Sequence, residues 1–348
     1  MQRSTRCSPK SPSEYRGKVL TRPEALDDGQ LEEALHQGWG LSVKALTHVA
    51  VGFGSYHWDV VADGARWFVT VDDLDAKRGD GINPRNDARR RLAAALSTAW
   101  ELRDSGMSFV VAPVRSKDDA ILHPSGDRFA VALYPYVAGE AHSWGAYPKR
   151  RDRIAVLDLI ARLHAAPERV KRLALVDDNV ISDRSDLAAA MDDLDEPWAA
   201  GPYAEPARKL LATHVDPLDA TLRRYDQFAA EVAGSPHRLV LTHGEPHPGN
   251  TITTSDGVVL VDWDTTLVAP PERDLWSLAG EDPRVLDDYE EKTGETPDGK
   301  ALMLYRLWWD LAEISGYLKL FRRPHRATED TRLAWDSLVR YLEPSRWQ

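Results

Sequence analysis

The sequence predicts an α+β protein of two lobes, an antiparallel sheet with a helix followed by a mainly helical lobe. Short runs rich in β-branched and aromatic residues, separated by turns, dominate the first part of the chain. From Arg150 onward, apolar residues recur with helical spacing. A hairpin signal, Asp256-Gly257 between two apolar runs, interrupts the helical part. We therefore expect a flexible polar tail over residues 1–20, an N-lobe over 21–137 and a C-lobe over 138–348.

The N-lobe is predicted to hold a helix over Pro23–Gly38 and a second helix over Asp87–Arg103. Its expected strands are Val43–Ala50, Trp58–Ala62, Trp67–Val71, Phe109–Val114, Ala120–Leu122 and Phe129–Leu133. The segment between the first two strands contains Gly52 and Gly54, and glycines allow backbone N–H groups to approach a phosphate. An ordinary hairpin turn explains the same two glycines equally well.

The C-lobe is predicted to be mostly helical. The helix that starts at Arg150 contains His164 at a helical spacing from other apolar positions, which favours a packed, structural histidine. The further helices are expected over Asp183–Leu194, Pro206–Val232, Asp282–Lys292, Gly299–Leu320 and Glu329–Leu342.

The most informative stretch runs from Leu239 to Asp274. Two apolar runs, Leu239–Leu241 and Val258–Val261, are expected to meet in a hairpin, and each is followed by polar side chains. These polar side chains are Glu245, His247 and Asn250 in the loop, and Asp262 and Asp264 after the second run. A hairpin whose polar loop only faces water is the alternative interpretation.

Phosphoryl transfer explains this set of side chains. Asn250 and Asp262 carry hard oxygen ligands of the kind that Mg²⁺ prefers, with phosphate and water completing its coordination. The carboxylate of Glu245 can orient a hydroxyl and accept its proton. A base together with an Asn and an Asp on the metal is the arrangement that phosphoryl transfer uses.

A resemblance to the aminoglycoside phosphotransferase family rests on two segments, and it implies a protein-kinase-like fold with choline kinase among its relatives. The segments are His243-Gly244-Glu245-Pro246-His247-Pro248-Gly249-Asn250 and Val261-Asp262-Trp263-Asp264. The family pattern is His-Gly-Asp, four residues, Asn, and a strand that ends in Asp. This chain keeps the spacing, and Glu245 stands where the family has Asp.

The resemblance also implies cofactors and a nucleotide site. Mg²⁺ would lie on Asn250 and Asp262, with ATP or GTP as the phosphate donor. Gly52, Gly54 and Ser55 match the loop that covers the phosphates, and Pro135 and Val137 match the connector that meets the adenine ring. Asp274 matches a structural acid of the family.

Two expected charges of the N-lobe are missing. Thr70 stands where the family has a strand lysine, and Ala94 or Ala95 stands where its helix glutamate should be. Losing both partners together is coherent, because either one alone would be an unpaired charge. Basic residues that could replace the lysine, with solvated surface charges as the alternative, are Lys77, Arg78 and Arg89–Arg91.

The acceptor is expected to be a small polar molecule with a hydroxyl group, an aminoglycoside-like antibiotic being the class that the family suggests. Candidate acceptor contacts are His247, Asp264, Trp309, Asp310 and Glu313. Acids beside aromatic rings suit a cationic or sugar-like molecule. A tryptophan-rich core helix with two capping acids explains the last three equally well.

Composition narrows the remaining function classes. The chain has 44 Lys and Arg against 55 Asp and Glu, a net charge of −11, which argues against a nucleic-acid partner. The single cysteine, Cys7, excludes an internal disulfide, and no apolar run is long enough for a membrane span, so we expect a cytoplasmic protein. Two rivals stay open: a kinase-like nucleotide-binding protein with little turnover, and a metal-dependent phosphoester hydrolase. The sequence leaves the oligomeric state open.

Overall fold

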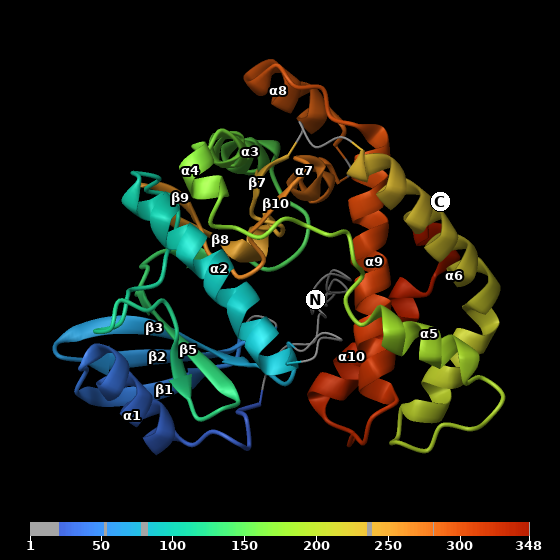
Figure 1. Cartoon of the computed structure of the whole chain (residues 1–348), viewed down its shortest axis with the longest axis horizontal. Helices are drawn as coiled ribbons and strands as arrows, with labels where there is room; N and C mark the ends of the chain where they lie inside the picture. The colour runs from blue at the N-terminus through green and yellow to red at the C-terminus, as the bar shows by residue number, and fades with distance from the viewer. Residues whose placement is uncertain (1–20, 52–53, 78–82, 235–238, 281, 348) are drawn as a thin grey trace, which may run out of the picture.

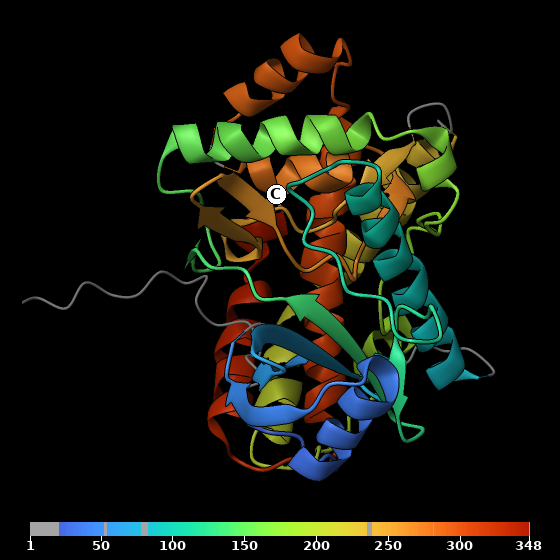
Figure 2. The same ribbon diagram turned by 90° about the vertical axis from the view of Figure 1, so that its left-hand side faces the viewer.

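The computed structural model describes residues 21–51, 54–77, 83–234, 239–280 and 282–347. A five-stranded antiparallel sheet, in the order β1-β2-β3-β5-β4, occupies one end of the molecule, and helices dominate the rest (Figures 1 and 2). This architecture confirms the predicted α+β class, with the sheet in the N-terminal part and the helices in the C-terminal part.

Helices cover both faces of the five-stranded sheet. Its strands are β1 (Val43–Val49), β2 (Tyr56–Ala62), β3 (Ala65–Asp73), β4 (His123–Ser125) and β5 (Phe129–Pro135). Side chains alternate between faces along a strand, so Val69 and Val71 of β3 join the apolar cluster under α1 (Asp28–Trp39). On the opposite face, Ala130 and Ala132 of β5 lie in the cluster that includes α2 (Pro84–Asp104).

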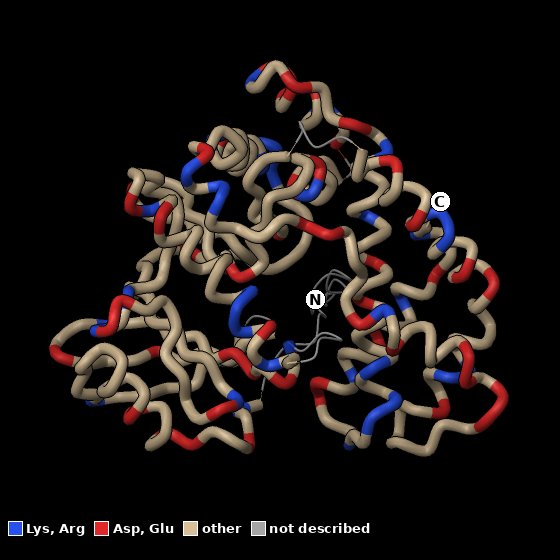
Figure 3. Tube along the Cα trace, in the orientation of Figure 1, with Lys and Arg blue, Asp and Glu red and all other residues tan. Residues whose placement is uncertain are grey.

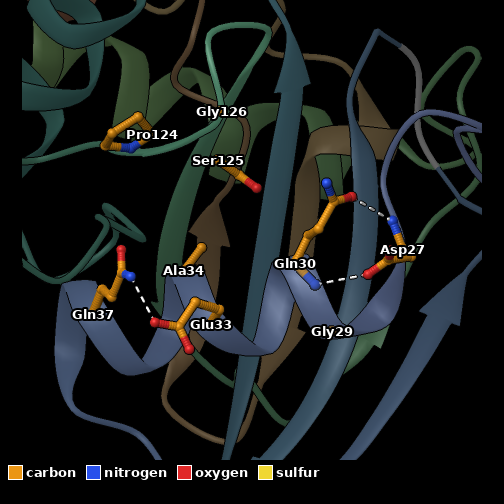
Figure 4. Close-up of a pocket in the computed structure, with 9 residues that line it drawn as sticks. All are labelled: Asp27, Gly29, Gln30, Glu33, Ala34, Gln37, Pro124, Ser125 and Gly126. Atoms are coloured by element: carbon orange, nitrogen blue, oxygen red, sulfur yellow. Dashed lines mark hydrogen bonds between the residues drawn. The ribbon is translucent and has the colours of Figure 1, made fainter.

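Helix α1 starts five residues later than the predicted Pro23. Asp27 caps it, because the Asp27 side chain accepts the N–H of Gln30 at 2.8 Å and the Gln30 side chain accepts the N–H of Asp27 at 3.0 Å. A hollow opens between α1 and the end of β4, at Pro124, Ser125 and the following Gly126 (Figure 4). None of the predicted site residues lines this hollow.

Phe109–Val114 is not a strand, contrary to the prediction. This segment forms an isolated parallel bridge to β9, in which Leu260 donates to Phe109 O at 2.7 Å and Val111 donates to Leu260 O at 3.0 Å. Phe109 and Val110 are buried in the same cluster as α2 and β9. Their apolar character therefore reflects burial between the sheet and the hairpin rather than a place in the sheet. The predicted strand Ala120–Leu122 is also displaced, to β4 at His123–Ser125.

The predicted hairpin exists, but its strands differ from those expected. It is formed by β8 (Thr251–Thr254) and β9 (Gly257–Leu260), and β6 (Glu140–Ala141) pairs with β8. The apolar run before the loop, β7 (Val240–Thr242), pairs instead with β10 (Leu267–Ala269).

The C-terminal part packs into two regions. Helix α3 and the hairpin belong to the cluster that includes α2, and α9 is the long central helix of a second cluster with α5, α6 and α10. Figure 1 shows these last helices side by side at the end of the molecule away from the sheet. The helices are α3 (Arg150–His164), α4 (Glu168–Lys171), α5 (Arg184–Asp192), α6 (Ala204–Ala233), α7 (Glu272–Ala279), α8 (Arg284–Thr293), α9 (Gly299–Phe321) and α10 (Glu329–Tyr341). Two of these, α4 and α7, were not predicted.

Charges of both signs are interspersed along the trace of the described residues (Figure 3). Among those residues, no helix combines the length and the apolar character that crossing a membrane requires.

Candidate active site

A buried carboxylate, Asp274 at the start of α7, fixes the beginning of the predicted catalytic loop. Its Oδ2 accepts the backbone N–H of His243 at 2.9 Å, and its Oδ1 accepts that of Gly244 at 2.5 Å. The His164 ring, which also contacts the Tyr289 hydroxyl at 2.8 Å, lies 3.1 Å from Asp274 Oδ2. Burial alone would raise the pKa of Asp274, but the hydrogen bond to His164 and nearby positive charge outweigh it and lower that pKa. The predicted structural roles of Asp274 and His164 agree with these contacts.

The His243 ring is held in one neutral form. Its Nδ1 accepts the N–H of Glu245 at 3.2 Å, so Nε2 carries the proton that is donated to Val261 O at 2.9 Å. The ring therefore connects the loop to the end of the hairpin. Burial lowers the pKa of His243.

Gly244 is required at its position in this loop. Its φ is +99°, and a Cβ atom there would lie 2.6 Å from a guanidinium nitrogen of Arg273. Arg273 in turn donates to the Thr242 hydroxyl at 2.9 Å and to Thr265 O at 2.8 Å, which ties β7 to the segment after β9.

The hairpin places Asn250 beside the end of β9. Val261 donates its N–H to Asn250 O at 3.0 Å, one step beyond the Thr251–Leu260 pair of the β8–β9 ladder. Asp262 follows directly, so the two predicted metal ligands come from adjacent positions of one ladder. The Asn250 amide nitrogen donates to Glu245 O at 3.1 Å, which leaves the amide oxygen as its side-chain acceptor.

Asp262 combines an unusual backbone with a crowded electrostatic environment. Its φ is +66°, a left-handed conformation that Asp and Asn tolerate better than most residues. The side chain reaches the surface, yet the surrounding protein, followed by the charges of Asp264 and Glu245, raises its pKa well above the usual range. A cation bound at Asp262 would offset this repulsion.

The donor set at this point fits Mg²⁺. Asn250 and Asp262 offer an amide oxygen and a carboxylate oxygen on neighbouring backbone positions, and a divalent ion there would relieve the repulsion among the acids. Among the described residues, no three His, Cys, Asp or Glu side chains form a ready-made metal cluster. Mg²⁺ sites with substrate phosphates need only one or two protein carboxylates.

Glu245 lies in the middle of the loop, with its side chain partly exposed. Its Oε2 is 3.3 Å from His247 Nε2, and the Tyr147 hydroxyl supports the same turn by donating to Pro246 O at 2.9 Å. The carboxylate is thus positioned by its backbone and by one imidazole. It has the chemistry of a base for a hydroxyl group that approaches from the solvent side.

Aromatic side chains continue from His247 toward α9. The Trp144 ring meets the His247 ring edge-on at 5.6 Å and stacks on the Trp309 ring at 6.4 Å with an interplanar angle of 15°. Trp309 also meets the ring of Trp276 at 5.4 Å. Trp144 is a member of this group that the sequence analysis missed, since it lies in a loop far from the motif.

Two predicted acceptor contacts have structural partners. Asp310 is buried and accepts from Arg346 at 2.7 Å, and Glu313 accepts from the Tyr317 hydroxyl at 2.9 Å. These contacts match the alternative of capping acids on a tryptophan-rich core helix. Asp264 is different, because its Oδ2 lies 2.6 Å from the Lys77 ammonium, which belongs to the turn after β3.

The predicted nucleotide contacts lie along β3, with Ser55 beside Asp72 near the end of the strand and Pro135 opposite Trp67 near its start. Gly54 has a φ of +76°, and the next residue, Ser55, donates its hydroxyl to the buried Asp72 at 2.5 Å. Pro135 ends β5, and Val137 follows in the connector. Gly52 lies outside the described residues. The connector then packs closely on the hairpin, since a Cβ atom on Gly139 would lie 2.6 Å from Thr253 O.

We expect Asp274→Asn to destabilise the protein. The substitution replaces one of two acceptor oxygens with a donor that faces a backbone N–H, and each unsatisfied buried group costs about 1–3 kcal/mol. Urea unfolding should show a loss of about 2–4 kcal/mol, whereas the exposed Asp118→Asn should change stability by less than about 0.5 kcal/mol. Equal stability of the two variants would contradict the anchoring role.

The lowered pKa of His243 predicts a pH dependence of stability. The unfolded chain takes up the proton near pH 6.5 while the folded one resists it, so this contribution is complete above about pH 6.5 and is lost as the pH falls below it. The free energy of unfolding should therefore drop between about pH 7.5 and 5.5. In His243→Gln this drop should be smaller, though not absent, because burial also lowers the pKa of His48, His57 and His123. An unchanged slope would contradict the assignment.

Comparisons with known proteins identify the family and the fold. Residues 46–305 match the phosphotransferase enzyme family. Protein StrN of Streptomyces griseus is 32% identical over 281 residues, which cover 76% of this chain and 81% of StrN.

Solved structures share the fold at low sequence identity. A spectinomycin phosphotransferase, APH(9)-Ia, in complex with ADP and spectinomycin, has a TM-score of 0.67 at 15% identity and covers 93% of this chain and 100% of its own. Choline kinase LicA from Streptococcus pneumoniae has a TM-score of 0.51 at 12% identity, covering 90% of this chain and 98% of its own. These likenesses confirm the predicted protein-kinase-like fold.

Proposed function

The chain belongs to the phosphotransferase enzyme family, and from this premise we propose that it moves the γ-phosphoryl group of ATP or GTP to a hydroxyl of a small polar molecule. The observation that carries the proposal is the convergence of Glu245, Asn250 and Asp262. The support is that the Asn250 amide donates to Glu245 O, and that Asp262 directly follows Val261, whose N–H donates to Asn250 O. A base beside an Asn and an Asp is the set of groups that phosphoryl transfer uses.

In the proposed reaction, Glu245 orients the acceptor hydroxyl and takes its proton. The acceptor oxygen forms a new bond to the γ-phosphorus, the bond from that phosphorus to the bridging oxygen breaks, and the nucleoside diphosphate leaves. Mg²⁺ held by Asn250 and Asp262 would neutralise phosphate charge. The protein contributes mainly position and electrostatics, as is usual for this chemistry.

We place the nucleotide against the N-lobe, residues 21–137, with Gly54 and Ser55 over its phosphates and Pro135 and Val137 beside its base. The support is that Ser55 contacts Asp72 near the end of β3, while Pro135 pairs with Trp67 near the start of β3 and leads into the connector. The C-lobe would then supply the loop and the acceptor side.

The acceptor would approach Glu245 beside His247 and the aromatic group that contains Trp144 and Trp309. Aromatic faces next to carboxylates favour a ring-shaped or cationic hydroxyl compound. Similar structures contain or are named for spectinomycin, amicoumacin and aminopropanol, and these compounds define the first acceptors to test. Asp310 and Glu313 are not part of this proposal, because Arg346 and Tyr317 account for their positions.

The test is consumption of ATP or GTP by the purified chain across a panel of hydroxyl compounds, with and without Mg²⁺. We expect nucleotide consumption that requires both the metal and an acceptor. Phosphate release without any acceptor would favour a hydrolase. Nucleotide binding without consumption across the panel would favour a binding protein with little turnover.

A further inference from the structure

We propose that Lys77 is the cation that binds the nucleotide phosphates in this chain, with Asp72 as the carboxylate that anchors it. The inference rests on the proposed function, and it assigns to a turn after β3 the role that the kinase template gives to a lysine within that strand.

Strand β3 has no basic residue at the position where the kinase template has its lysine. Thr70 occupies it, within hydrogen-bonding reach of the Tyr134 hydroxyl on the neighbouring strand. The basic residue of β3, Arg66, lies at the other end of the strand and pairs with Asp59. On α2, Glu101 pairs with Arg169, away from the sheet.

The Lys77 ammonium reaches the region that the strand lysine would serve. It lies 2.9 Å from Asp72 Oδ1 and 2.6 Å from Asp264 Oδ2, and 24% of the side chain remains exposed. Asp264 is two residues beyond Asp262, the proposed metal ligand. The Lys77 ammonium group therefore contacts both Asp72, at the end of an N-lobe strand, and Asp264, beside the proposed metal site of the C-lobe.

The turn that carries Lys77 is held in place by the backbone. The Lys77 N–H donates to Asp73 O at 3.1 Å, and the Lys77 carbonyl accepts from the Arg91 guanidinium of α2 at 3.1 Å. Arg91 thus supports the turn, which gives a basic residue of α2 a structural use. Arg78, another candidate from the sequence, lies outside the described residues.

Asp72 has the properties that an anchor needs. Its side chain is 3% exposed, and besides Lys77 it accepts the hydroxyl of Ser55, the residue after Gly54 in the glycine-containing loop. Lys77, Asp72 and Ser55 therefore form one hydrogen-bonded group beside the place proposed for the phosphates. The Asp72 carboxylate holds the Lys77 ammonium group in position and balances its charge, as the helix glutamate does for the strand lysine in the kinase template.

Charge balance indicates which contact would change on binding. A polyphosphate with its divalent ion brings negative charge to Lys77 and positive charge to Asp262 and Asp264. The Lys77–Asp264 contact would then be replaced by a contact of Lys77 with phosphate and a contact of Asp264 with the divalent ion. The buried contact between Lys77 and Asp72 would stay. A purely structural ion pair predicts the opposite, because it would have to be broken without compensation.

The experiment measures equilibrium binding of ATP, with Mg²⁺, and of adenosine by calorimetry. Lys77→Met keeps the aliphatic chain and removes the charge, Lys77→Arg keeps the charge, and Lys44→Ala is the control, an exposed lysine on β1. Lys77→Met should weaken ATP binding about 10- to 100-fold, the loss expected for one hydrogen bond to a charged group. Adenosine binding should not change, and Lys77→Arg should retain most of the ATP affinity.

Four results would overturn the inference. Equal ATP affinity of wild type and Lys77→Met would make Lys77 a bystander. Tighter ATP binding by Lys77→Met would make it a competitor for Asp264. Parallel loss of ATP and adenosine binding would indicate damage to the whole pocket. Failure of the wild type to bind any nucleotide would overturn the proposed function as well, so the two failures are distinguishable.

Discussion

Asp262→Asn should abolish phosphoryl transfer and leave the fold intact. The substitution removes the negative charge at the proposed metal position, and we expect kcat to fall on the order of 10³-fold or more, as when a charge-stabilising group is lost from such a site. Asparagine tolerates the left-handed φ of +66° at this position, so backbone strain does not contribute to the loss.

Stability separates the metal hypothesis from a folding defect. Removing one of three crowded carboxylates relieves repulsion, so the melting temperature of Asp262→Asn should equal or exceed that of wild type. Steady-state assays at several Mg²⁺ concentrations provide the measurement. Near-normal turnover of the variant at saturating Mg²⁺ would contradict the assignment of Asp262 as a ligand.

Glu245→Gln should lower kcat by about 10²- to 10⁴-fold, the usual worth of a positioned base. Glutamine keeps the shape of the side chain and can retain a contact with His247, but it cannot accept the hydroxyl proton. Acceptor KM should change much less than kcat, because the proton moves only in the transition state.

A matched variant isolates the effect of the carboxylate. His247→Gln removes the imidazole that lies 3.3 Å from Glu245 while leaving the proposed base, so its loss of kcat should be clearly smaller. If Glu245→Gln and wild type have the same kcat, the residue is a bystander. Equal losses in the two variants would instead point to a loop that is merely disturbed.

The core of the candidate site was predictable because its geometry is local. Asn250 and Asp262 lie on one hairpin, and a turn at Asp256-Gly257 is enough to bring them together. Spacing along the sequence therefore carried the information about these two residues. The role of Asp274 came from the resemblance to the family, and its contacts with His243 and Gly244 came from the structure.

Pairing between distant strands was not predictable in the same way. Phe109–Val114 has the composition of a strand, yet it forms only an isolated bridge to the end of β9 and a single hydrogen bond from Val114 N–H to Leu133 O of β5. Thr251–Thr254 alternates poorly in hydrophobicity, and so β8 was missed although β-branched residues fill it. Local composition indicates that a segment is buried and extended, but it does not indicate which strand the segment pairs with.

The proposed replacement for the strand lysine also depends on contacts between residues far apart in the sequence, which local patterns do not predict. The sequence offered several basic residues after β3 without ranking them. Lys77 is singled out by its contact with Asp264, 187 residues away, and by the buried Asp72 beside it. Such contacts depend on how the two lobes meet, which no local pattern encodes.

The central claim is transfer of a phosphoryl group to a small molecule at the loop and hairpin, and product analysis tests it most directly. The wild type and Asp262→Asn are each incubated with Mg²⁺, an acceptor panel and a nucleotide carrying an isotopic label on its γ-phosphoryl group. Mass spectrometry should find one labelled phosphoryl group on an acceptor hydroxyl with the wild type, and none with the variant. Label found only in inorganic phosphate, or equal labelling of the acceptor by both proteins, would contradict the account.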